Sequence, residues 1–156
     1  MRIEGEFSVD AEPSEVWSVI LDPDTLCRLA ESCEEARRLD DTHYAGIMRV
    51  KLPFISLRAH VRGHITQMRA PTWMVVELEG ETEGLPGTFR GMLELKLRQV
   101  GAGSYGRYSF EMDLLGKLGA LGQPFLAKAA ARLAESFSVK VSRHVRETRQ
   151  GLRAKS

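Results

Sequence analysis

Two histidines in one alternating segment are the first residues that could do chemistry, since a pair of imidazoles can bind a metal ion. His60 and His64 are four positions apart and share one face of the segment 55–67. Because a strand rises ~3.3 Å per residue, their side chains lie about 13 Å apart. Zinc–nitrogen bonds are only about 2.0–2.1 Å long. One ion cannot bridge them, and because His43 and His144 have no evident partner in the sequence, we predict no metal site.

The charged residues around these histidines are typical of a solvent-facing sheet surface. Apolar and polar positions alternate cleanly through the segment 55–67, and the next segment alternates in the same way. Such alternation indicates an antiparallel sheet with one dry face and one wet face. We expect Arg58 and Arg62 to lie opposite Glu77 and Glu79 as cross-strand pairs.

The carboxylates Glu111 and Asp113 come closest to a catalytic pair. They share one face of the last strand-like segment, but they alternate with Phe110 and Met112 and should therefore face water. No serine lies in the GxSxG context of a nucleophile elbow. A phosphate-binding loop and a dinucleotide fingerprint are also absent from the sequence. The sequence therefore predicts no catalytic residue and no cofactor.

The composition indicates an ordinary globular protein that does not bind nucleic acid. The chain has 156 residues, of which 43% are hydrophobic and 28% charged, and its net charge is +1. The opening MRIEGEFSVD lacks the apolar core of a signal peptide, and no apolar run approaches the ~20 residues that span a bilayer. We therefore expect a cytoplasmic protein in which Cys27 and Cys33, whose spacing is not that of a CxxC pair, are reduced and packed.

The elements that must position these residues follow from the hydrophobic periodicity. Two short helices are expected near 11–20 and 25–32, and a long amphipathic helix follows Gly116. The expected strands are 2–9, 34–39, 43–52, 55–67, 74–81, 89–97 and a last one that ends near 114. A single helix that follows a run of strands must pack across them. We predict an α+β fold in one domain, residues 1–150, with a frayed basic tail, 151–156.

The predicted interior has room for a ligand. Small residues introduce the long helix at Gly116, Gly119 and Gly122, and alanines thin its middle around Ala130. A helix gripped by a curved sheet can enclose a cavity, and inward methionines adapt to varied ligands. We therefore predict a pocket for a lipophilic small molecule. Its expected lining is Trp17, Met48, Leu57, Val61, Met74, Leu78, Phe89, Leu93, Phe110, Phe125, Leu126 and Leu133.

The end of the long helix is basic. Its cationic residues are offset there only by Glu147, and they are Arg143, Arg146, Arg149, Arg153 and Lys155. Cations near a helix C-terminus interact favourably with the helix dipole. The same residues could instead bind anionic lipid headgroups, at ~1 kcal/mol per basic residue. The sequence leaves both interpretations open.

Three stretches together resemble the family of the carbon monoxide dehydrogenase G-subunit, within the START/Bet v 1-like (SRPBCC) superfamily. They are the opening MRIEGEFSVDAEPSEVWSVILDPDTL, the loop and strand start GLPGTFRG at 84–91, and the helix entrance GKL with LGQ at 116–123. The likeness spans about residues 1–140. The corresponding motif residues are Gly84, Gly87, Gly91, Gly116, Lys117, Leu118 and Gly122.

The resemblance implies a helix-grip fold: a curved antiparallel sheet of about six to seven strands, two short N-terminal helices and one long C-terminal helix over the sheet. It implies a non-catalytic accessory protein that holds a lipid-like or quinone-like molecule beside a molybdenum hydroxylase of the CO dehydrogenase type. It also implies docking at the inner membrane face. Some members continue into a membrane anchor, whereas this sequence stops at Ser156, so we expect peripheral contact only.

Two alternatives remain open from the sequence. Some members of the superfamily are cyclases or hydrolases, and Tyr44, Gln67 and Tyr108 are the polar residues that the pattern directs inward. The protein could also be a docking module whose interior is filled. Two or more polar groups that converge on one pocket would favour the enzyme.

Overall fold

The computed structural model describes residues 1–155 and the side chains of residues 1–151. Its strands form one antiparallel sheet in the order β1-β7-β6-β5-β4-β3-β2. They are β1 (Arg2–Val9), β2 (Cys33–Arg38), β3 (His43–Lys51), β4 (Ser56–Arg69), β5 (Trp73–Glu83), β6 (Gly87–Val100) and β7 (Gly103–Gly116). The sheet curves around one side of the long helix α3 (Gln123–Lys155). This confirms the predicted helix-grip architecture, with the charged strand β2 at an edge.

Two short helices fill the connection between β1 and β2. In α1 (Pro13–Leu21), the side chains of Glu12 and Glu15 form a reciprocal capping box. Asp22 ends α1 and also caps α2 (Pro23–Leu29), because its side chain accepts a hydrogen bond from the Asp24 amide. The second helix therefore begins directly after Asp22, earlier than predicted, since proline is favoured in a first helical turn.

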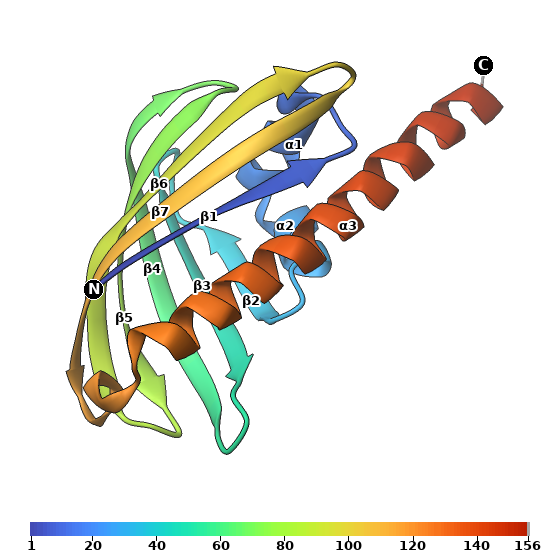
Figure 1. Cartoon of the computed structure of the whole chain (residues 1–156). Helices are drawn as coiled ribbons and strands as arrows, with labels where there is room; N and C mark the ends of the chain where they lie inside the picture. Colours follow the sequence, from blue (N-terminus) through green and yellow to red (C-terminus); the bar gives the residue numbers. More distant parts are fainter. Residues whose placement is uncertain (156) are drawn as a thin grey trace.

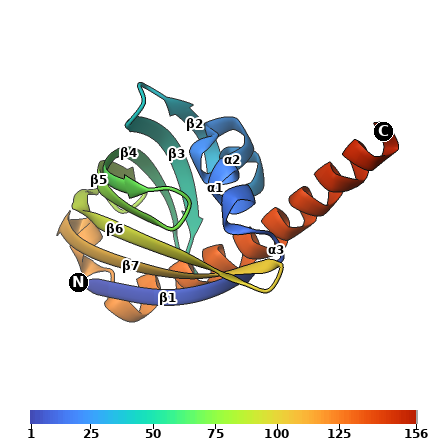
Figure 2. The same ribbon diagram turned by 90° about the horizontal axis from the view of Figure 1, so that it is seen from above.

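The long helix begins later than predicted. A 3-10 turn, η1 (Lys117–Ala120), separates β7 from α3, and the Leu121 amide closes it by donating to the Leu118 carbonyl at 3.1 Å. Gly116 enters this turn with φ of +74°, a left-handed conformation that favours glycine. The three glycines of the entrance thus precede α3 instead of loosening it. Figures 1 and 2 show that α3 continues past the sheet at its C-terminal end.

Aromatic rings lie directly on glycines across the inner face of the sheet. A Cβ added to Gly5 would collide with the Tyr108 ring, and one added to Gly80 would collide with the Phe89 ring. Glycine within a strand permits such close approach and marks strong bending. These contacts let neighbouring strands curve around the interior without leaving the bare backbone exposed.

The apolar interior divides into two clusters. The first joins α1 and the C-terminal half of α3 to the sheet and includes Val16, Trp17, Val141 and Val145. The second lies at the other end, where Leu57, Phe89, Leu118 and Leu121 pack together. Leu126 on α3 contacts both clusters. The region between the clusters is the one that the predicted pocket would occupy.

The prediction of reduced cysteines was wrong. The structure joins Cys27 on α2 to Cys33 at the start of β2 by a disulfide, with their Cα atoms 5.1 Å apart. The chain reverses after α2, where the Cys33 amide donates to the Ala30 carbonyl, and this turn brings the two residues together. Their sequence spacing alone could not indicate this proximity.

Candidate functional site

The centre of the inner face keeps surface that water can reach. Seven of the predicted pocket residues are partly buried there: Met48, Val61, Leu78, Leu93, Phe110, Leu126 and Leu133. They come from β3, β4, β5, β6, β7 and α3, so the fold brings them to the same side of the sheet. Apolar side chains that face inward yet remain accessible are what a lipophilic ligand would need.

The remaining predicted pocket residues lie elsewhere. Four are buried in the two clusters: Trp17, Leu57, Met74 and Phe89. Phe125 is instead 42% exposed at the start of α3. For Leu57, Met74 and Phe89, the alternation of side chains predicted the inward direction but could not show how deeply each is covered.

Of the accessible strand residues, Leu78, Leu93 and Phe110 lie in two adjacent cross-strand rows, and Val61 and Met48 lie in the next rows towards the second cluster. One row contains Val76, Leu93 and Phe110, and the other contains Gly63, Leu78, Gly91 and Met112. The next row towards the first cluster, Met74, Leu95 and Tyr108, is buried. The backbone of α3 approaches the sheet most closely along β1, at its edge, rather than over these middle strands. Only side chains can therefore cover the two rows.

Small residues increase the room at this place. A Cβ added to Gly63 would touch only the side-chain ends of Leu78 and Val76, both at 3.4 Å. On the facing helix, Ala127 and Ala130 are partly buried and pack towards the first cluster. Larger residues at these positions would fill the space between α3 and the middle strands.

The polar groups near the interior do not converge. The Tyr44 hydroxyl donates to the Leu21 carbonyl at 3.3 Å, and burial raises the pKa of Tyr108. The prediction for Gln67 was wrong: a bulge between Ile65 and Gln67 shifts the alternation of β4 and leaves Gln67 exposed. The Trp17 indole N–H is buried without a hydrogen-bond partner among the described residues.

Two of the three resemblance stretches, the loop at 84–91 and the helix entrance at 116–123, meet at one corner of the molecule. The Leu118 amide donates to the Pro86 carbonyl at 3.1 Å, which ties the helix entrance to the loop between β5 and β6. A Cβ on Gly87 would collide with the Leu118 side chain, and one on Gly116 would lie 3.1 Å from the Gly87 Cα. Gly84 in the same loop has φ of +95°. These motif residues shape the turn that directs the chain into α3.

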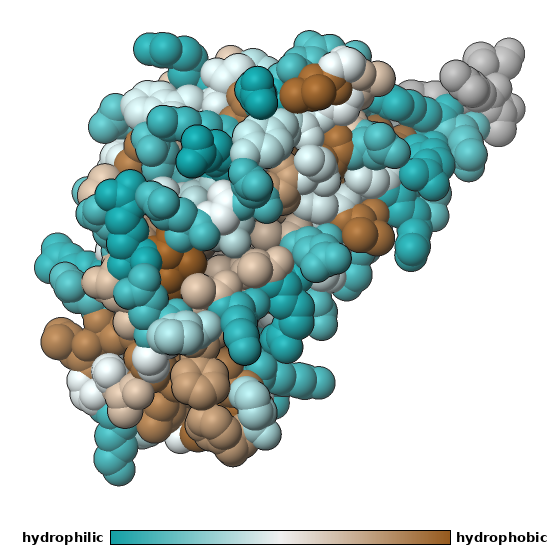
Figure 3. Space-filling model, viewed as in Figure 1, coloured by the Kyte–Doolittle hydropathy of each residue, from teal (hydrophilic) through white to brown (hydrophobic). Residues whose placement is uncertain are grey.

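The same end of the molecule carries exposed apolar side chains. We call Phe54, Leu115 and Phe125 the apolar end; they are 72%, 64% and 42% exposed. The rings of Phe54 and Phe125 meet edge to face, with centroids 5.9 Å apart. Figure 3 shows the apolar surface gathered at this lower end, below a largely hydrophilic body. Arg132 lies beside it and donates to the Lys51 carbonyl at 3.3 Å.

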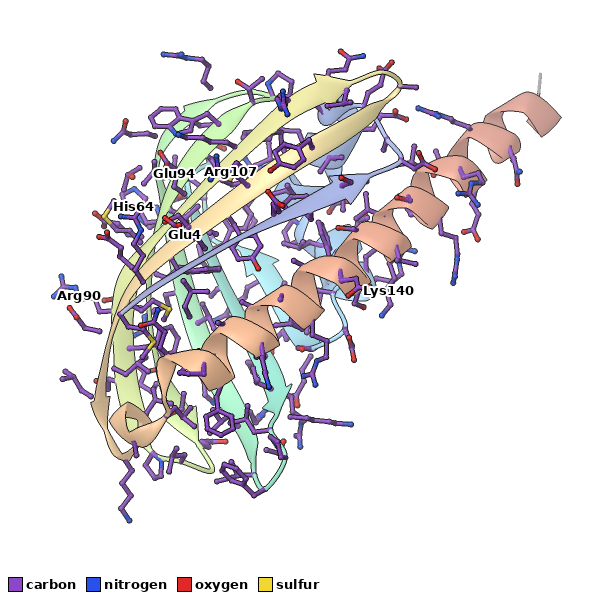
Figure 4. All side chains as sticks on the ribbon, in the orientation of Figure 1. Glu4, His64, Arg90, Glu94, Arg107 and Lys140 are labelled. Carbon is purple, nitrogen blue, oxygen red and sulfur yellow. A yellow bond between two sulfur atoms is a disulfide. The ribbon has the colours of Figure 1, made fainter. Side chains whose placement is uncertain are left out.

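Charged residues pair across the outer face of the sheet, the side away from α3 (Figure 4). Arg62 lies opposite Glu79, as predicted, and also binds Glu81 at 2.8 Å. Arg58 lies opposite Glu83 rather than Glu77 and binds Glu34 at 3.0 Å. In an antiparallel pair, residue numbers rise along one strand as they fall along the other. Arg58, four residues before Arg62, therefore lies opposite Glu83, four residues after Glu79.

His43 has a partner that its position in the sequence did not indicate. The β3–β4 register places His43 opposite His64, and the two rings stack with centroids 4.1 Å apart. Asp40 Oδ1 lies 2.8 Å from the His43 ring nitrogen, and hydrogen bonds from the Thr42 amide and His43 lower the pKa of Asp40 to about 2. Both histidines line a hollow of about 830 Å³ whose other lining residues are mostly on the outer face. Gly63, Leu78, Gly91 and Met112, from one of the two rows above, also contribute to its lining. Within residues 1–151, no group of three or more His, Cys, Asp or Glu side chains could hold a metal ion.

The basic end of α3 is partly neutralised by the N-terminal region. Arg149 forms an ion pair with Glu15 on α1, and Arg146 lies 3.9 Å from Asp10. The side chains of Arg153 and Lys155 are not described, and Ser156, the last residue of the predicted tail 151–156, lies outside the described residues. No helix in the described part of the chain has the length and apolar character needed to cross a bilayer.

A family model described as the carbon monoxide dehydrogenase G-subunit (CoxG) matches residues 5–146. The chain belongs to the CoxG family. Among solved structures, a conserved protein from Geobacillus kaustophilus has a TM-score of 0.82 at 19% identity, over 95% of this chain and 97% of that one. A START superfamily protein from Mycobacterium smegmatis has a TM-score of 0.68 at 9% identity, over 94% and 98%. At these identities the structural matches show the fold alone. No curated protein matched the sequence.

Proposed function

We propose that this CoxG-family protein is a non-catalytic accessory protein that holds a lipid-like or quinone-like molecule between its sheet and α3. The observation that supports this most is the set of partly buried, inward-facing apolar residues in the middle strands, among them Leu78 and Leu93. Apolar burial supplies ~25 cal/mol per Å² before the costs of binding. A ligand would cover surface that the protein itself leaves accessible.

The ligand proposal is tested by filling the interior from α3. Ala130 is partly buried and faces inward, whereas the adjacent Ala131 is exposed. Each alanine is replaced by Trp in a separate variant, and each variant is titrated with ubiquinone-1 and with the apolar dye N-phenyl-1-naphthylamine. We expect Ala130→Trp to abolish binding and Ala131→Trp to retain it. Absence of binding to the wild-type protein, or equal loss in both variants, would contradict an interior site.

The family suggests the partner. CoxG is named for a subunit of carbon monoxide dehydrogenase, and we propose association with a molybdenum hydroxylase of that type. Co-expression with such a hydroxylase followed by size-exclusion chromatography should yield a common peak. Separate elution of the two proteins, with and without ubiquinone-1, would argue against this partner.

Peripheral membrane contact is the third part of the proposal. We expect the apolar end to make this contact, because Phe54 and Leu115 are its most exposed side chains and Lys51, Lys117 and Arg132 are nearby cations. Interfacial binding combines buried apolar area with attraction to anionic lipids. In a co-sedimentation assay, the Phe54→Ser variant should bind phosphatidylglycerol vesicles much more weakly than the wild-type protein. If Arg143→Ala weakens this binding more, the basic end of α3 makes the contact instead.

A further inference from the structure

A second hollow, of about 700 Å³, lies on the outer face of the sheet where β6 and β7 meet the β4–β5 turn. This end of the strands is opposite to the one that carries the apolar end, as the course of the strands in Figure 1 shows. We call it the basic hollow. The lining residues that matter are Arg69, Trp73, Lys96, Arg98, Tyr105 and Arg107.

The cations of the basic hollow are poorly neutralised. Within residues 1–151, no carboxylate lies within 4.0 Å of the Arg69, Arg98 or Arg107 guanidinium groups, and Lys96 has only Glu94, at 3.8 Å. On the same face Arg58 and Arg62 have carboxylate partners, whereas Arg90 has none within 4.0 Å among the described residues and lies apart from other unpaired arginines. Gathering unpaired like charges opposes folding. Stability alone therefore does not account for this arrangement in a chain whose net charge is only +1.

Aromatic rings hold two of these arginines in place. The Arg69 guanidinium lies 5.9 Å from the Trp73 ring centroid, and that of Arg98 lies 4.9 Å from the Tyr105 centroid. The rings are fixed in turn, because the Trp73 indole N–H donates to Glu94 at 2.9 Å and the Tyr105 hydroxyl donates to Glu6. A guanidinium ordered before binding loses less side-chain entropy when it meets an anion.

We propose that the basic hollow binds a carboxylate-rich segment of a partner protein. Guanidinium groups pair with carboxylates through two parallel hydrogen bonds, and Trp, Tyr and Arg are the residue types that dominate binding energy at protein interfaces. A nucleotide fits less well, because arginines already cover the faces of both rings on which a base would stack. A membrane fits less well, because Leu97, the aliphatic lining residue, is buried. This binding does not depend on whether the interior holds a ligand.

The experiment uses Trp73 as a local reporter. The chain has two tryptophans, so Trp17→Phe leaves only the indole in the basic hollow. Titration with a short polyglutamate peptide should change the Trp73 emission, and affinity should fall as salt rises. We expect Arg98→Ala or Arg107→Ala to weaken binding ~5- to 30-fold, as for other charge-assisted pairs, and Arg98→Glu to abolish it.

The matched control is Arg90→Ala, which removes the same charge from β6 outside the basic hollow; Figure 4 labels Arg90 and Arg107 on the same face. Arg90→Ala should bind polyglutamate as the parent does, with circular dichroism confirming that each variant is folded. If an alanine variant does not fold, the Arg107→Gln variant is tested in its place. The proposal is overturned if the parent does not bind the peptide, if Arg90→Ala loses as much as Arg98→Ala, or if ATP or phosphatidylglycerol vesicles bind the basic hollow more tightly than the peptide. Ubiquinone-1 binding, followed through Trp17 in a Trp73→Phe variant, reports separately on the interior.

Discussion

The inner and outer faces of the sheet differ in how their side chains are satisfied. On the inner face, Tyr108 and Phe89 lie on glycines of neighbouring strands, and the centre remains partly accessible. On the outer face, Arg58 and Arg62 are paired with carboxylates, whereas in the basic hollow only Lys96 has a carboxylate partner among the described residues. Each face therefore has one region whose side chains are covered or paired within the protein and another region where apolar surface is left accessible or charges are left unpaired. These accessible and unpaired regions are where we place the two proposed binding activities, because folding alone does not account for them.

The largest expected contrast between the faces lies at two adjacent residues of β6. Phe89 is 8% exposed in the second cluster, and Arg90 is exposed on the outer face. We expect Phe89→Ala to lower the free energy of unfolding by about 3–5 kcal/mol, through lost burial and a new cavity. Arg90→Ala should change it by less than ~0.5 kcal/mol. Urea unfolding followed by circular dichroism measures both, and similar values would mean that the two faces are not energetically distinct.

The next contrast is within the inner face. A Cβ at Gly80 would collide with the His60 carbonyl and the Phe89 ring, whereas one at Gly63 meets only side-chain ends at 3.4 Å. We expect Gly80→Ala to cost about 1–3 kcal/mol of unfolding free energy, since overpacking shifts the backbone. The unfolding free energy of Gly63→Ala should be within ~1 kcal/mol of that of the parent. Alanine lowers the conformational entropy of the unfolded chain, and this gain offsets the small shift required of the Leu78 and Val76 side chains. If Gly63→Ala proves the more costly, the middle of the inner face is filled rather than open.

A smaller effect is expected at the indole of Trp17. Its N–H group is buried without a partner among the described residues, so removing it sacrifices no hydrogen bond. We expect Trp17→Phe to lower the unfolding free energy by no more than about 1–2 kcal/mol, mainly through lost packing, whereas Trp17→Ala should cost about 3–5 kcal/mol. Thermal unfolding of both variants checks this. A Trp17→Phe cost close to that of Trp17→Ala would reveal a hydrogen bond of the indole in solution, for example to water.

The alternation of apolar and polar residues along the strands predicted correctly which face of the sheet most strand side chains point to. Leu78 and Leu93 face inward, and Glu111 and Asp113 face water, because side chains alternate with a period of two. The predictions failed where local backbone geometry breaks that period. The bulge before Gln67 could not be predicted from residue types, and the 3-10 turn at 117–120 delayed the long helix.

Features that depend on register were beyond sequence reasoning. The stacking of His43 on His64 requires the pairing of β3 with β4, and the Cys27–Cys33 disulfide requires the chain reversal after α2. The basic hollow likewise gathers Arg69, Arg98 and Arg107 from three different strands. None of these arginines stands out in the sequence, because each is flanked by ordinary strand residues. Only the fold makes them neighbours.

The smallest expected effect concerns an ion pair on the outer face. Glu34 accepts hydrogen bonds from Arg49 at 2.7 Å and from Arg58 at 3.0 Å, and these bonds lower the pKa of Glu34 below 4.5. Because the folded pKa is depressed, the resulting stability is present above pH 4.5 and is lost as the pH falls through the folded value. Glu34→Gln should therefore be slightly less stable than the parent at neutral pH. The difference should vanish in acid and shrink in ~1 M salt, where the screening length is about 3 Å. Urea midpoints across this range of pH measure it. A difference that persists in acid would mean that Glu34 acts through packing, and the contrast between a charge-paired outer face and an apolar inner face would then be weaker than the geometry indicates.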